Sequence, residues 1–176
     1  GSAFRLQLHG SPKDTAAAAC DRLLLATSLD TTRGLLEPIV TRATSLLPTD
    51  ASSARAVAQV MKANDRGGCP YVFAGDSVLY LLADACIPTR YAFPSTLAYD
   101  AERGASGADE VAELNRILAT RPPVIVTMDE PMAPWNPATH NIMTATLARS
   151  YRQVLTVPRE DAHLLVYLRR DLPLRR

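Results

Sequence analysis

A chain of 176 residues is long enough for one domain with a sizeable core that needs no metal or disulfide to hold it together. Apolar residues make up 47% of it, charged residues 21%, and the formal net charge is +1. This is the composition of a soluble α/β or α protein, and it gives no reason to expect nucleic acid or an acidic membrane as partner. The arginines are scattered along the sequence, which favours genomic base composition over phosphate recognition as the reason for their number.

The sequence carries neither a membrane-spanning run nor a signal peptide that we recognise. No apolar run approaches the ~18 to 20 residues of a membrane-spanning helix, and residues 1–10 lack the basic-then-apolar layout of a signal peptide. We therefore expect a soluble chain. The pair Gly1-Ser2 is typical of a cloning remnant, so the missing membrane segments say little about the parent protein.

Helical patterns come first along the chain. Residues 1–49 are helix-like in composition, although Gly34 and Pro38 interrupt them, and we expect an N-terminal helical segment there. A helix then follows Asp50, because apolar residues recur at helical spacing until Gly67-Gly68.

From residue 70 onward, strands alternate with helices. The predicted helices cover residues 76–85, 106–121 and 136–150, the last with Asn136 as cap and Pro137 in its first turn. Such alternation predicts a Rossmann-like three-layer α/β domain over residues 50–176, with a mainly parallel sheet and a C-terminal antiparallel hairpin. We expect its strands near residues 70–74, 90–93, 123–127, 151–157 and 163–169.

One stretch resembles a known family. Residues 68–94 read "GCPYVFAGDSVLYLLADACIPTRYAFP", with Leu79-Tyr80 near a helix start and "PTRYAFP" at 88–94, and "PPVIV" follows at 122–126. This order is similar to the C-terminal extracytoplasmic region of bacterial polyprenyl-phosphate-dependent membrane glycosyltransferases of the GT-C type. These include protein mannosyltransferases and the aminoarabinose transferases of lipid A. The resemblance covers roughly residues 51–168.

The resemblance implies a location and partners. The domain would lie at the periplasmic or extracytoplasmic face of a bacterial inner membrane. Its first partner would be the membrane-embedded part of the same polypeptide. A second partner would be a lipid-linked sugar or the acceptor of that sugar. The catalytic acids of the family lie far upstream of this region, so no catalytic residue is carried over.

A search for other chemistry finds little. The sequence has no phosphate loop, no full dinucleotide fingerprint, no His-Glu-x-x-His and no nucleophile elbow, so we assign no cofactor. His9, His140 and His163 lie in separate elements without a second ligand at metal spacing, and we assign no metal. We expect His140 and His163 to be structural.

Sheet topology suggests a candidate site. Ligands of open parallel sheets bind beyond the carboxyl ends of the strands, where Asp76 follows one predicted strand and Asp129-Glu130 follow another. These carboxylates could bind a cation or a sugar hydroxyl. Alternatively, Asp76 caps a helix and the other two are solvated loop residues. Trp135 could stack on a sugar ring or cover an edge of the core.

Arg90 has two possible roles in the 88–94 segment. If the segment is extended, Arg90 and Tyr91 point to opposite faces of the sheet. Arg90 would then bond to carbonyls or to a carboxylate such as Asp84 or Asp129 and hold the segment in place, or it would bind a lipid-linked phosphate.

The three cysteines allow one bridge. Cys69 begins a predicted strand and Cys86 ends the helix after it, and such a helix runs back toward the start of its strand. These two are the plausible disulfide pair, the alternative being buried free thiols.

Two functions of different class remain open. The first is a non-catalytic soluble domain that packs over the membrane part of a glycosyltransferase and guides acceptor or sugar. The second is a stand-alone α/β enzyme or nucleotide-sugar binding protein that uses the carboxylates at the sheet edge.

Overall fold

The computed structural model describes residues 48–175 except 92, 106, 108 and 160. The chain divides into two compact units, residues 1–46 and 47–176, and every described element belongs to the second. The helical segment expected over residues 1–49 lies outside the described residues, apart from 48 and 49, which begin the first described helix. In chain order the elements are α3 (Pro48–Ala63), β1 (Tyr71–Val72), α4 (Val78–Ala83), α5 (Ser95–Ala98), the 3-10 helix η1 (Asp100–Glu102), α6 (Glu110–Ala119), β2 (Val124–Met128), α7 (Pro137–Ser150), β3 (Tyr151–Arg159) and β4 (Ala162–Arg169).

Helices α6 and α7 begin where their sequences provide caps. The Asp109 side chain accepts a hydrogen bond from the Ala112 N–H at the start of α6. The Asn136 side chain does the same for the Ala138 N–H at the start of α7, with Pro137 in the first turn, as predicted. Each cap satisfies a backbone donor that has no partner within its helix. Among the described helices, none is both long enough and apolar enough to span a bilayer.

The sheet has the strand order β1-β2-β4-β3 and is mixed. The prediction of a mainly parallel sheet is wrong: only β1 and β2 pair in parallel, whereas β4 runs antiparallel to both β2 and β3. The predicted C-terminal hairpin of β3 and β4 is confirmed. This hairpin is the physical reason for the mixed sheet, because the tight turn reverses β4 and β4 inserts beside β2. Strand β3 then lies parallel to β2, with β4 between them.

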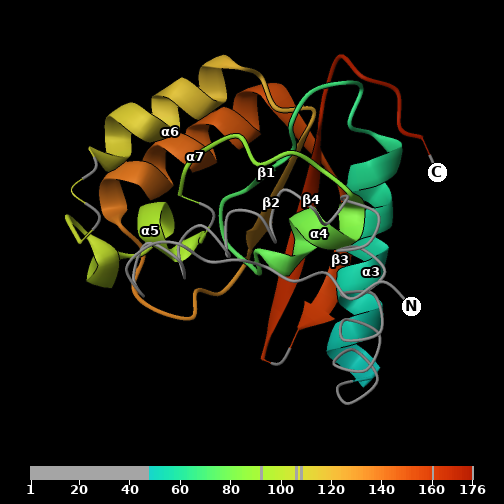
Figure 1. The fold of residues 1–176 in the computed structure, drawn as a ribbon, viewed down its shortest axis with the longest axis horizontal. Helices are drawn as coiled ribbons and strands as arrows, with labels where there is room; N and C mark the ends of the chain where they lie inside the picture. Colours follow the sequence, from blue (N-terminus) through green and yellow to red (C-terminus); the bar gives the residue numbers. More distant parts are fainter. Residues whose placement is uncertain (1–47, 92, 106, 108, 160, 176) are drawn as a thin grey trace, which may run out of the picture. The chain divides into compact units, whose positions relative to one another are not determined.

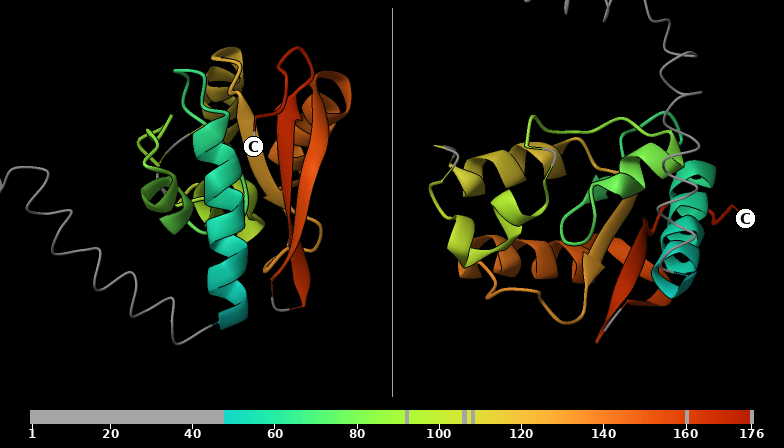
Figure 2. Two further views of the ribbon diagram at one scale, coloured as in Figure 1. Left: turned by 90° about the vertical axis from the view of Figure 1, so that its right-hand side faces the viewer. Right: turned by 60° about the horizontal axis from the view of Figure 1, so that its bottom comes forward.

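Helices lie on both faces of this sheet (Figures 1 and 2): α3 and α4 on one face, α6 and α7 on the other. Alternate residues of β4 reflect this arrangement. Leu164 is buried near Gly75 and Leu79 on the α4 side, whereas Leu165 and Tyr167 line a groove with residues of α7. Strand β2 has helices on both sides, which is why all five of its residues are buried.

The strand expected over residues 90–93 is wrong for the described residues of that range, which form no strand. Two prolines and the disulfide described below hold the chain in an irregular path from the end of α4 to α5 (Figure 1). Strand β1 is also shorter than expected, although the Phe73 N–H still donates to the Val126 carbonyl at 2.8 Å.

Candidate functional site

The structure brings the predicted carboxylates to one edge of the sheet. Because β1 and β2 are parallel neighbours, their carboxyl ends lie together, with Asp76 beyond the first strand and Asp129 directly after the second. We call Asp76, Asp129 and Glu130 the carboxyl-end edge. Its topological position agrees with the prediction, but the electrostatics differ, because the two aspartates each hold a cationic or ionisable partner from the β3–β4 hairpin.

Asp76 forms an ion pair with Arg159. Its Oδ2 accepts a hydrogen bond from the Arg159 Nη1, and the arginine side chain is only 15% exposed, against 41% for the aspartate. The helix-capping role expected for Asp76 is wrong, since α4 has Ser77 at its N-cap and no side-chain cap. The nearby guanidinium attracts the carboxylate more strongly than the helix end does, because its charge is a full unit.

Asp129 joins the end of β2 to the start of β4. Its Oδ1 accepts hydrogen bonds from the N–H groups of His163 (2.7 Å) and Glu130 (2.8 Å), and its Oδ2 lies 2.7 Å from the His163 Nδ1. The backbone N–H of His163 is the main reason that the pKa of Asp129 lies below its ordinary value. The structural role expected for His163 fits this arrangement. Glu130 is exposed, and its side chain has no partner among the described residues, as expected of a solvated loop residue.

Tyr99 lies beside the Asp76–Arg159 pair, and the sequence did not suggest it. Tyr99 is 5% exposed and its hydroxyl has no hydrogen bond of normal geometry within the described part of the chain. Burial raises the pKa of this phenol, with a smaller opposing effect from Arg159. The tyrosine is therefore neutral near neutral pH.

Trp135 packs within the protein. Its ring stacks on Phe73 and on His140, with centroids 5.9 and 4.7 Å away, and lies tilted against Tyr99 at 5.5 Å. Burial lowers the pKa of His140, so this imidazole is neutral near neutral pH and stacks as an uncharged ring. Of the two roles left open by the sequence, these contacts favour the covering of a core edge over stacking on a sugar.

The segment of residues 86–94, here called the strap, connects α4 with α5. Arg90 is exposed, and its guanidinium carbon lies 4.9 Å from the centre of the Tyr91 ring. The expected bond from Arg90 to Asp84 or Asp129 does not form: Asp84 lies 3.6 Å from the Lys62 ammonium, and Asp129 binds His163. Arg90 therefore stays at the surface, where its guanidinium packs against the Tyr91 ring.

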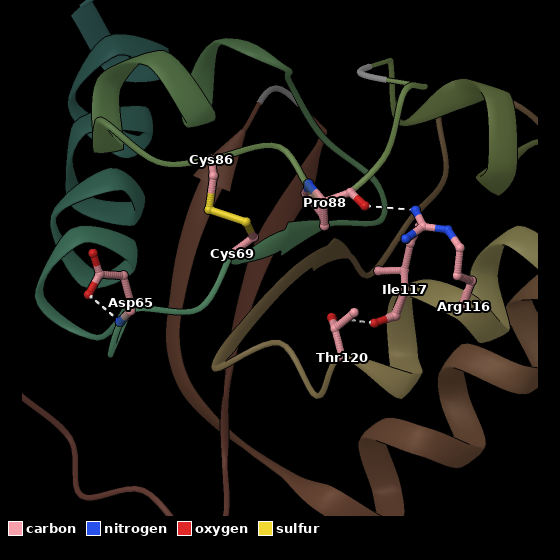
Figure 3. Close-up of a disulfide and its surroundings, with 8 residues drawn as sticks. Asp65, Cys69, Cys86, Pro88, Arg116, Ile117 and Thr120 are labelled. Atoms are coloured by element: carbon pink, nitrogen blue, oxygen red, sulfur yellow. Dashed lines mark hydrogen bonds between the residues drawn. A yellow bond between two sulfur atoms is a disulfide. The ribbon is translucent and has the colours of Figure 1, made fainter.

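Two anchors hold the strap (Figure 3). Cys69 and Cys86, the plausible pair of the sequence analysis, are bonded and join the strap to the start of β1, with Cα atoms 5.1 Å apart. On the other side, the Arg116 Nη2 of α6 donates to the Pro88 carbonyl at 2.8 Å. The strap is thus fixed to both a strand and a helix.

Glu113 of α6 completes the second anchor. It accepts a hydrogen bond from the Thr89 hydroxyl at 2.6 Å and two from Arg116 at 2.7 and 2.8 Å. The hydrogen bonds from Arg116 are the main reason that the pKa of Glu113 falls to about 2. The carboxylate is therefore ionised at any pH at which the protein would work.

The described residues contain no group of three or more His, Cys, Asp or Glu side chains placed to hold a metal ion. Comparisons with protein-family models, with curated proteins and with solved structures found no match to this chain.

Proposed function

We propose that this chain is a non-catalytic extracytoplasmic domain of a membrane glycosyltransferase of the GT-C type, which packs over the membrane-embedded part of the same polypeptide and guides acceptor or sugar. We also classify its fold as a three-layer sandwich related to the Rossmann type, since helices lie on both faces of the sheet and two strands pair in parallel. The antiparallel β4 is the departure from that type.

The observation that carries the proposal is the anchored strap. Residues 88–94 belong to the stretch that carries the family resemblance, and Cys86 of the Cys69–Cys86 bridge lies two residues before them. Disulfides persist in oxidising compartments and are rare in the cytosol. A disulfide at this place therefore supports the extracytoplasmic location that the resemblance implies.

Exposed apolar side chains support a contact surface at the same place. Of the six large hydrophobic residues that are exposed in the described part of the chain, four lie between residues 78 and 93. Leu81 is 52% exposed and Phe93 is 70% exposed. Side chains of this kind gather where a protein meets another apolar surface. We assign α4 and the strap as the surface that rests on the membrane-embedded part.

The alternative of a stand-alone enzyme or nucleotide-sugar binder requires carboxylates free to act at the carboxyl-end edge. Asp76 and Asp129 are instead bound to Arg159 and His163. A sugar hydroxyl or a cation would have to displace these partners first, so the edge supports this alternative less well than the strap supports the first proposal.

The test uses the full-length parent protein and the isolated chain. In the full-length protein, Phe93→Asp should reduce transfer from a polyprenyl-phosphate sugar, because it places a charge in the apolar contact. Met132→Asp is the matched control, since Met132 is 58% exposed but lies outside the strap and α4. The isolated chain should show no transfer.

Three results would contradict the proposal: transfer by the isolated chain alone, equal loss of activity in the two variants, or a native gene that begins near residue 3 without membrane helices upstream. Equal thermal stability of the two variants in the isolated chain ensures that a loss of transfer is not a loss of folding.

A further inference from the structure

We propose that a pocket at the end of the sheet opposite the carboxyl-end edge binds a phosphate group. The pocket has a volume of about 370 Å³ and lies between the carboxyl ends of α6 and α7. Its lining includes three arginines and three neutral polar residues: Arg121, Arg149, Arg169, Asn115, Thr146 and Ser150. The proposal rests on this pocket alone and does not depend on the glycosyltransferase assignment.

The fold gathers arginines that are far apart in the sequence. Arg121 precedes β2, Arg149 lies in the last turn of α7, and Arg152 is the second residue of β3. Arg169 ends β4 and Arg170 follows it. Because β2 and β3 start at the end of the sheet where antiparallel β4 finishes, all five lie at the same end. The scatter along the sequence, which argued against phosphate recognition, therefore does not persist in the fold.

Most of this charge is not neutralised. Asp171 is the one carboxylate that pairs with these five arginines in the described part of the chain, at 3.3 Å from Arg121 and 2.6 Å from Arg169. Arg152 donates to the carbonyls of residues 169, 170 and 172, and such bonds leave its positive charge in place. Arg152 and Arg170 line the neighbouring groove beside α7, so the pocket itself holds three arginines against the one carboxylate of Asp171, an excess of two positive charges.

Two neighbouring groups do not cancel this positive charge. The carboxyl ends of α6 and α7 point toward the pocket and contribute about half a negative charge each, which lowers the excess but does not cancel it. The phenol of Tyr151 lines the pocket and donates to the Pro122 carbonyl at 2.8 Å, and burial raises its pKa to about 12. It thus remains neutral and adds no negative charge.

Arg149 is the residue best placed to receive a ligand. It is exposed, it lines the pocket, and its side chain makes no hydrogen bond or ion pair with any described residue. Arginine binds phosphate oxygens through two parallel N–H donors, and the amide and hydroxyl groups of Asn115, Thr146 and Ser150 add further donors. A phosphate or diphosphate group, free or in a lipid headgroup, is the chemistry that these donors recognise.

The test measures two probes with the whole chain. The first is inorganic pyrophosphate, followed by calorimetry in low salt. Wild-type protein should bind it, added salt should weaken the binding, and Arg149→Ala should raise the dissociation constant about tenfold. Arg149→Lys should fall between the two, because lysine keeps the charge and loses the paired donors. The matched control is Arg103→Ala, an exposed arginine paired with Asp100 and outside the pocket, which should bind as wild type does.

The second probe is a set of vesicles of equimolar phosphatidylglycerol and phosphatidylcholine, with pure phosphatidylcholine as reference. If wild-type protein sediments with the anionic vesicles and Arg149→Ala does not, a lipid headgroup is supported as the source of the phosphate. Binding of pyrophosphate without binding of vesicles would support a soluble phosphate ligand. Failure of wild-type protein to bind either probe would overturn the proposal, as would equal weakening by Arg103→Ala and Arg149→Ala when circular dichroism shows both variants folded.

Discussion

The strap and the carboxyl-end edge both present polar side chains at the surface, but different forces hold them. The strap is tied to β1 by a disulfide and to α6 through Glu113, whose side chain is only 16% exposed. At the edge, Asp76 and Asp129 are 41% and 38% exposed, and each binds a partner from the β3–β4 hairpin. The ion pairs alone do not separate the two regions, because Arg159 at the edge is as little exposed, 15%, as Glu113 at the strap. The disulfide does, and it gives the strap the larger share of local stability.

Removing the disulfide should have the largest effect. The bridge spans a sequence separation of 17 residues, and a loop of about this size contributes about 3 kcal/mol in the chain-entropy model. We expect the double variant Cys69→Ser/Cys86→Ser to lose about this much free energy of unfolding in chemical denaturation.

Reductant provides the control for this prediction. It should lower the stability of wild-type protein to that of the double variant and leave the double variant unchanged. Mass spectrometry of unreduced, alkylated protein should find one free thiol, and three free thiols would refute the bridge.

Replacing Trp135 should have the next largest effect on stability, and it tests whether Trp135 packs in the core beside the carboxyl-end edge or serves a ligand there. We expect Trp135→Ala to lower the free energy of unfolding by about 2 kcal/mol, less than for a fully buried tryptophan, because the half-buried ring loses its stacking on Phe73 and His140. Phe93→Ala is the control and should change stability little, since that ring is 70% exposed. Trp135 is the chain's one tryptophan, so a sugar titration that changes its fluorescence would speak for ligand stacking instead.

The sequence predicted α3, α4, α6, α7 and the C-terminal hairpin because local signals define them, and it missed the short α5 and η1. Asn136 and Pro137 mark the start of α7, and a tight turn joins β3 to β4. The place of β4 between β2 and β3 depends on which strand edges pair, and alternation along the chain does not encode that. The path of the strap was missed for a similar reason. Its composition is typical of a strand, but the disulfide to Cys69 and the hydrogen bond to α6 hold it in an irregular conformation.

The sequence predicted where the candidate site lies but not which side chains pair with its carboxylates. Topology alone puts Asp76 and Asp129 beyond neighbouring parallel strands. Their partners Arg159 and His163 come from a hairpin more than thirty residues further along the chain, and no local pattern links them. The arginine pocket was missed because its members are brought together only when β2, β3, β4 and two helix ends meet.

Glu113→Gln tests the second anchor of the strap. We expect a loss of about 1 to 2 kcal/mol near neutral pH, because the variant gives up charged hydrogen bonds to Arg116 and Thr89. The pKa of Glu113 is about 2 in the folded protein and about 4.3 in an unfolded chain, so its contribution is present above the unfolded value and is lost as pH falls toward the folded one. The difference between wild type and variant in denaturation experiments should therefore vanish toward pH 2. Glu102→Gln, whose side chain has no described partner, should show no such convergence.

Asp129→Asn should have a smaller effect at the edge. The asparagine oxygen can still accept from the His163 and Glu130 N–H groups, so we expect a loss of about 1 kcal/mol or less. The pKa of Asp129 is lowered in the folded protein, so its contribution is present above the ordinary aspartate value and is lost as pH falls below it. Thermal melts across acidic pH measure this. If Asp129→Asn were more stable than wild type at neutral pH, the carboxylate would destabilise the fold at the edge, as expected of a binding site. Glu130→Gln is the control and should leave stability unchanged.

Arg90→Ala should have the smallest effect and separates the strap's anchors from its exposed face. Arg90 stacks on Tyr91, and an exposed interaction of this kind is worth about 0.5 kcal/mol. Its charge also helps to lower the pKa of Glu113, as the smallest of the causes. Arg116→Ala should cost more, because Arg116 holds both Glu113 and the Pro88 carbonyl. Denaturation of the two variants side by side gives the difference. If Arg90→Ala destabilised the chain as much as Arg116→Ala does, Arg90 would be a third anchor. If Arg90→Ala costs less stability than Arg116→Ala, Arg90 contributes little to folding. A loss of transfer by Arg90→Ala in the full-length protein would then report a lost contact with a substrate or with the membrane-embedded part.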